Sequence, residues 1–119
     1  MTPERRAEIK RAAIRLLLLQ RPRGEYGLTL LNLDDPVTGG AFVCGSMEDY
    51  EKSAGVNAVA EGSTSRAGRG PAVVLVRRGL DGAERAYTAA HEFGHAVLRH
   101  GAENVTEEEK EADVFAEEF

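Results

Sequence analysis

Apolar and polar positions along residues 2–20 predict a helix at the start of the chain. Thr2 can cap its first turn, Pro3 suits the first helical position, and Glu4 places an acid where the helix dipole favours one. We expect this helix to end near Gln20, because the sequence Arg-Pro-Arg-Gly that follows at 21–24 breaks helices.

Apolar runs in the central part of the chain predict strands. Residues 26–33 and 41–44 flank a segment rich in turn-forming residues, so together they predict a hairpin. Residues 55–60 are a third candidate strand. The strongest is 72–76 (AVVLV), whose continuous apolar run predicts burial on both faces. The intervening stretch 62–70 (GSTSRAGRG) predicts a flexible loop.

Three further helices are expected, a short one at 46–52, one from about Glu84 to His100, and one from about Val105. The last helix carries an apolar stripe at Ala112, Phe115, Ala116 and Phe119. The layout is helix, small sheet, helix, helix. We therefore expect an α+β fold that forms a single domain over residues 1–119.

Composition favours an ordinary globular domain, with 42% hydrophobic and 29% charged residues. The single cysteine, Cys44, excludes an internal disulfide and fits a reducing compartment. The apolar run Leu16–Leu19 is too short for a signal peptide or a membrane span. We expect a cytoplasmic protein with no membrane partner.

The net charge of −5 is unevenly spread along the chain. Residues 1–24 carry seven Arg or Lys against two Glu, whereas residues 101–119 carry eight Asp or Glu against one Lys. A basic first helix could contact nucleic acid or an acidic partner. No recognisable nucleic-acid module surrounds it, so a solvated helix face is favoured and direct nucleic-acid binding is not expected.

The sequence HEFGH at residues 91–95 predicts a metal site with its own general base. His91 and His95 lie on one face of a helix, where both imidazoles can bind one tetrahedral ion. Glu92 is rotated away from that ion, so its carboxylate can take a proton from a metal-bound water. Glu92 is also the only charged residue in 89–98. An ordinary surface helix would carry more charge, and buried histidines need partners that a metal supplies.

The third metal ligand must come from outside this helix. His100 lies on another helix face, and we expect it to cap or pack at the helix end. Leu98 and Gly101 stand where an extended three-histidine motif would need a glycine and a histidine.

Acidic residues of the last helix are the candidates for that ligand. Helix geometry places Glu108 and Glu109 nearest the apolar stripe and does not separate them. Asp113 follows Glu109 by four residues, where it could hydrogen-bond a ligating histidine. A capping box from Thr106 would tie Glu109 to the helix start, whereas a start at Asn104 would free it. We favour Glu109.

Two motifs together resemble the ImmA/IrrE-type zinc metallopeptidases. Their pattern is HExxH, a short loop, and then ExxA[ND]xFA on the next helix; here the second motif is EKEADVFA at 109–116. The resemblance implies a minimal zincin-like fold with metal ligands His91, His95 and Glu109, and with Glu92 as general base. Zn²⁺ is the expected ion, although two imidazoles and a carboxylate also suit Mn²⁺ or Fe²⁺.

The chain departs from the family pattern at its end. Members usually continue past the second motif with an apolar segment, whereas this sequence stops at Phe119. We therefore expect either a minimal form or a chain truncated at its C-terminus. The short loop between His95 and Glu109 predicts a shallow cleft.

The resemblance implies an endopeptidase that cleaves a specific protein. Family members act on helix-turn-helix transcriptional repressors in mobile-element or stress-response settings, so such a regulator is the expected substrate. Tyr87, one turn before His91, could stabilise the oxyanion, but an aromatic core residue occupies this family position and packing is favoured. The alternative function is a non-catalytic, metal-containing module that binds a regulatory partner.

Overall fold

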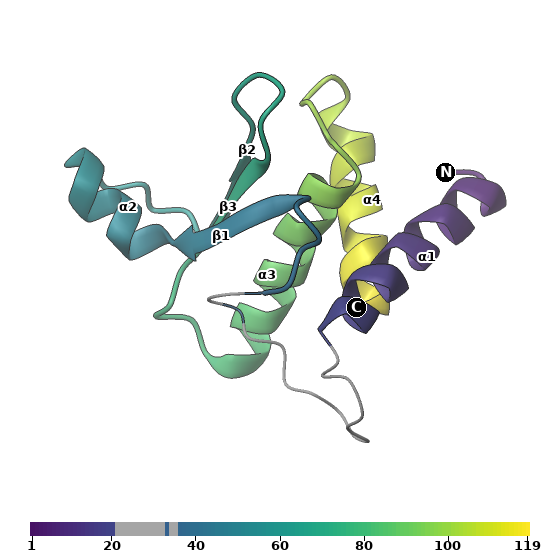
Figure 1. The fold of residues 1–119 in the computed structure, drawn as a ribbon, viewed down its shortest axis with the longest axis horizontal. Coiled ribbons are helices and arrows are strands. Elements are labelled where there is room, and N and C mark those ends of the chain that lie inside the picture. The colour runs from purple at the N-terminus through teal and green to yellow at the C-terminus, as the bar shows by residue number, and fades with distance from the viewer. Residues whose placement is uncertain (21–32, 34–35) are drawn as a thin grey trace.

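The computed structural model describes residues 1–20, 33 and 36–119, and it has the α+β fold expected from the sequence (Figure 1). Its elements are α1 (Pro3–Leu19), β1 (Phe42–Ser46), α2 (Met47–Ala54), β2 (Gly62–Ser65), β3 (Ala72–Val76), α3 (Gly82–Val97) and α4 (Val105–Glu118). Within the described ranges, no helix is long and apolar enough to cross a bilayer.

The three strands form one mixed sheet in the order β1-β3-β2. β1 runs parallel to β3, and β2 runs antiparallel to it. The prediction that the central strand is buried on both faces is wrong. Val74 of β3 is fully buried, whereas the neighbouring Val73 is 39% exposed. Helix α3 covers only one face of the sheet, so burial alternates along the strand.

Two expectations about the centre of the chain need correction. Residues 55–60 form no strand, and the segment expected to be a loop provides β2 at 62–65. β2 consists of small and polar residues at the sheet edge, so it lacks the apolar pattern that marks buried strands. The predicted strand 26–33 lies, apart from Leu33, outside the described residues; its expected partner β1 pairs with β3.

The helices stack outward from the sheet. α3 packs on the sheet, α4 packs on α3, and α1 packs on α4 (Figure 1). The ring of Phe93 from α3 stacks on Phe42 from β1 at a centroid distance of 4.9 Å. Phe115 of α4 is completely buried and belongs to the same core. This core fixes α3 against α4, the two helices that carry the candidate metal ligands.

Helices α1 and α3 begin and end close to the predicted positions. In α1, Thr2 caps the first turn by accepting a hydrogen bond from the Arg5 N–H at 3.1 Å. Its buried stripe consists of Ile9, Ala13 and Leu16. α3 ends at Val97, three residues before the expected end. Arg99 then adopts a φ of 57°, in the left-handed region, which turns the chain away from the helix axis.

Gly94 allows α3 and α4 to approach closely. A Cβ atom at this position would lie only 3.0 Å from Cβ of Phe115. We expect Gly94→Ala to lower the free energy of unfolding by about 1–2 kcal/mol, because overpacking exceeds the gain in helix propensity. Urea denaturation measures the change. Gly82→Ala is the control, since nothing lies within 4 Å of its added Cβ. Equal stability of the two variants would contradict a tight helix contact at Gly94.

Candidate metal centre

The three predicted ligands converge between α3 and α4. His91 and His95 project from successive turns of α3, and their Nε2 atoms lie 3.1 Å apart. Glu109 reaches across from α4. Its Oε2 lies 3.0 Å from His91 Nε2, and its Oε1 lies 3.0 Å from His95 Nε2.

The start of α4 determines which acid faces the histidines. Asn104 is the N-cap, and its side chain accepts a hydrogen bond from the Glu107 N–H at 3.3 Å. Glu108 turns to the loop between the helices, where its Oε1 accepts hydrogen bonds from the N–H groups of Gly101 and Ala102 at 2.8 and 3.1 Å. The structure therefore separates the two acids that helix geometry left equivalent, and Glu109 is the one that faces the histidines.

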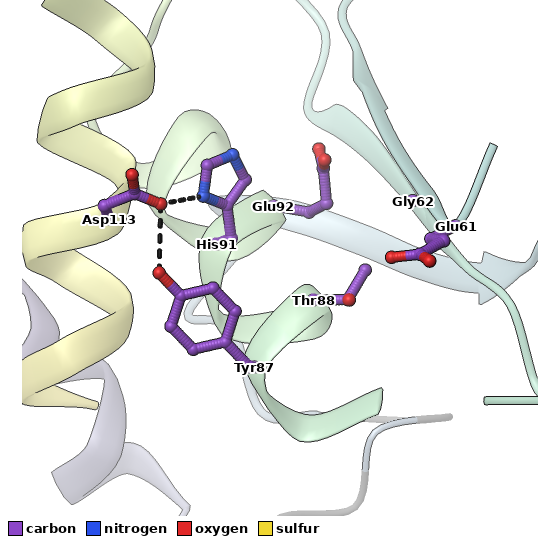
Figure 2. Close-up of a pocket in the computed structure, with 7 residues that line it drawn as sticks. All are labelled: Glu61, Gly62, Tyr87, Thr88, His91, Glu92 and Asp113. Atoms are coloured by element: carbon purple, nitrogen blue, oxygen red, sulfur yellow. Dashed lines mark hydrogen bonds and ion pairs between the residues drawn. The ribbon is translucent and has the colours of Figure 1, made fainter. Parts of the chain in front are cut away.

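Asp113 and Tyr87 lie behind His91 (Figure 2). Asp113 reaches from α4, and its Oδ1 lies 2.9 Å from His91 Nδ1. The Tyr87 hydroxyl donates to the same oxygen at 3.0 Å. Tyr87 is 47% exposed, so the expectation that it packs in the core is wrong. The pKa of the Tyr87 phenol is raised, mainly by partial burial and secondly by its hydrogen bond to Asp113.

The arrangement of the histidine nitrogens and the Glu109 oxygens fits a bound cation. The Asp113 carboxylate accepts the Nδ1–H of His91, so a neutral ring presents a lone pair at Nε2. That lone pair faces a Glu109 oxygen at 3.0 Å, and two electron-rich atoms at this distance repel unless a cation or proton lies between them. Ligand atoms on tetrahedral zinc lie about 3.3 Å apart, close to the spacing found here. Burial lowers the pKa of His95, which favours the neutral, ligating form of its ring.

Glu92 projects beside His91, toward the edge strand β2 (Figure 2). The hydroxyl Oγ1 of Thr64 in β2 lies 2.6 Å from Glu92 Oε2 and 3.0 Å from the Glu92 carbonyl oxygen. Gly62 makes this approach possible, because a Cβ there would lie 2.8 Å from Glu92 Cγ and 2.9 Å from Thr88 Cγ2. Neither Gly62 nor Thr64 was predicted from the sequence as part of the site. The run of small residues GSTS is the signal that could have indicated a close backbone approach.

Two hollows meet at Glu92 and Gly62. One, of about 380 Å³, is lined also by Tyr87, His91 and Asp113, among others. The other, of about 610 Å³, extends past His95 and Glu109 along residues 62–64 of β2. Glu92 lies where the two hollows adjoin, and we refer to the two hollows together as the groove.

His100 lies behind His95. Its imidazole is buried, as a packing role requires, yet it makes specific polar contacts. Its Nδ1 lies 2.8 Å from His95 Nδ1, and its Nε2 lies 2.9 Å from Oε1 of Glu111. Glu111 is paired in turn with Arg5 of α1. The hydrogen bonds from Arg5 lower the pKa of Glu111 to about 2. Neither Arg5 nor Glu111 was predicted from the sequence to have a role in the site.

The part of the chain that carries this site matches a known protein family. Residues 48–119, more than half of the chain, match the model of peptidase family M78, described as the IrrE N-terminal-like domain. The match runs from α2 to the end of α4 and includes both histidines, Glu92 and Glu109. No curated protein and no solved structure matches the chain significantly.

Proposed function

Because this chain belongs to the IrrE N-terminal-like family of peptidases, we propose that it is a zinc-dependent metalloendopeptidase. One observation carries the proposal: donor atoms of His91, His95 and Glu109 converge at 3.0–3.1 Å, with the Glu92 carboxylate beside them. Two imidazoles and one carboxylate, with a fourth position open, form a ligand set of catalytic zinc.

In the proposed mechanism, the side chains around the ion orient the reactants and move the protons. When bound, zinc supplies a Lewis acid for the substrate carbonyl and lowers the pKa of a water molecule to about 7. Glu92 accepts the proton of the attacking water and then delivers it to the leaving amine. The Thr64 hydroxyl, 2.6 Å from Glu92 Oε2, holds that carboxylate in one orientation. Asp113 fixes the ring of His91 with Nε2 toward the ion.

The groove supports an extended polypeptide as substrate. β2 lies at the sheet edge, and among the described residues it pairs only with β3. Residues 62–64 of β2 line the groove, so a substrate segment that adds to this edge as a further strand would bring a peptide bond to Glu92. The resemblance to ImmA/IrrE-type enzymes favours a helix-turn-helix repressor as this substrate. The single cysteine supports a reducing compartment, such as the cytoplasm, as the place of action.

The proposal is tested by zinc-dependent proteolysis. We expect the zinc-loaded protein to cleave an unstructured protein such as casein, or a purified helix-turn-helix repressor, at internal bonds. Chelation should abolish cleavage, and one equivalent of zinc should restore it. Mass spectrometry of the products locates the bonds. Stoichiometric zinc binding without cleavage of either substrate would instead favour a non-catalytic binding module, and cleavage that resists chelation would contradict a metallopeptidase.

A further inference from the structure

The contacts behind His95 continue through two further side chains to the N-terminal helix. Arg5 of α1 donates to both oxygens of Glu111 on α4, from Nε at 2.8 Å and from Nη2 at 2.9 Å. Glu111 Oε1 lies 2.9 Å from His100 Nε2, and His100 Nδ1 lies 2.8 Å from His95 Nδ1. We infer that Arg5, Glu111 and His100 are positioning residues that orient the ring of His95, so that α1 forms part of the metal site. The inference rests on the proposed role of His95 as a ligand.

For a neutral His100 ring, the donor and acceptor groups of its neighbours set the order of hydrogen bonds along this chain. Arg5 can only donate, and its two hydrogen bonds keep Glu111 as an ionised acceptor. Glu111 then requires an N–H at Nε2 of His100, which leaves a lone pair at Nδ1 of a neutral ring. That lone pair accepts the Nδ1–H of His95. The Nε2 of His95 therefore carries a lone pair, on the side that faces His91 and Glu109.

The reverse order is disfavoured by the same contacts. If His95 accepted at Nδ1, a neutral His100 would turn a lone pair toward the Glu111 carboxylate at 2.9 Å. The arrangement thus selects the tautomer of His95 that can bind a metal through Nε2.

Burial shows that these contacts are specific. Glu111 is only 8% exposed, although it stands among exposed acids of α4. A buried carboxylate is costly unless hydrogen bonds and an opposite charge compensate it, and Arg5 and His100 provide both. Arg5 lies outside residues 48–119, the segment that matches the family model. α1 thereby contributes a side chain from beyond the matched region.

The two histidines have different partners. Asp113 accepts directly from His91, whereas a neutral imidazole separates His95 from the charge of Glu111. An ion pair that only joined α1 to α4 would stabilise the fold without changing the ring of His95. Metal affinity and the tautomer of that ring therefore distinguish positioning from plain structural support.

The first test uses Arg5→Gln, with Arg6→Gln as its matched control. Arg6 is an exposed neighbour on the same helix, so both variants remove one positive charge from α1. We expect Arg5→Gln to weaken zinc binding about 10-fold in a chelator competition, within the range typical of such partners, and Arg6→Gln to leave it unchanged. Arg5→Lys keeps the charge without the paired hydrogen bonds and should lose less. Equal affinities for Arg5→Gln and Arg6→Gln would overturn the inference.

The second test measures the tautomer of His95 by ¹⁵N NMR in the metal-free Glu109→Ala protein, because in the wild type the Glu109 carboxylate, 3.0 Å from His95 Nε2, competes for the ring proton. In this background we expect the Nδ1–H form, and a mixture of tautomers when His100→Phe is added. His100→Gln offers an acceptor oxygen and should restore part of the Nδ1–H population. An unchanged tautomer in His100→Phe would overturn the inference. Failure of the wild type to bind zinc would count against the proposed function, while this measurement would still decide whether the chain orients His95.

Discussion

Glu92→Gln should lower peptide cleavage about 1,000-fold while zinc remains bound, because loss of a general base removes a contribution of this order. The glutamine has the shape of Glu92 and can still accept the hydrogen bond from Thr64. Its amide cannot accept the proton of the attacking water. Single-turnover cleavage rates measure the loss, and metal analysis shows whether the ion is retained.

Glu61→Gln is the matched control for this variant. Glu61 lines the same groove, and its substitution removes the same charge, but it lies on the far side of Glu92 from His91 (Figure 2). We expect Glu61→Gln to keep nearly full activity. Full activity in Glu92→Gln, with bound zinc, would show that another group takes the proton.

Glu109→Gln should weaken zinc binding by more than about 100-fold, beyond the effect typical of removing a ligand's hydrogen-bond partner. The neutral amide loses the charge attraction of Glu109 for the ion. Glu108→Gln is the control, because its amide oxygen can still accept from Gly101 and Ala102. Chelator competition measures both affinities. If Glu108→Gln gave the larger loss, the assignment of the third ligand would be wrong.

Glu109→Gln should not lower the thermal stability of the metal-free protein, although it weakens zinc binding. There, the Glu109 carboxylate faces the Nε2 atoms of two imidazoles with no cation between them. A glutamine amide can donate a hydrogen bond to one of them, which is worth about 0.5–1.5 kcal/mol. Glu109→Gln should therefore melt at an equal or higher temperature than the wild type without metal, and at a lower one with saturating zinc.

The sequence predicted the helices well because each has a local signal. Thr2 and Asn104 are caps that act within their own first turns. The buried stripe of α4 repeats with the helical period, and its phase places Glu108 and Glu109 nearest α3, although only the loop contacts of Glu108 separate the two acids. The recognised motifs at 91–95 and 109–116 therefore lay on elements whose boundaries could be read locally.

The parts that escaped prediction depend on contacts between distant residues. Arg5 and Glu111 are 106 positions apart in the sequence. No local pattern shows which of the eight acids in residues 101–119 pairs with Arg5. β2 was missed because an edge strand of small residues has no apolar alternation. The burial of β3 was overestimated because a sequence does not show that helices cover only one face of the sheet.

The contact between Gly94 and Phe115 also bears on how the protein would take up and release the proposed zinc ion. It belongs to an apolar core that joins α3 and α4 through residues other than the metal ligands. We therefore expect the two helices that carry the candidate ligands to assemble without the ion, in contrast to small zinc modules that unfold when their metal is removed. The availability of zinc should accordingly switch the activity of this protein on and off reversibly. The protein stays folded in both states, so it does not have to refold each time zinc binds.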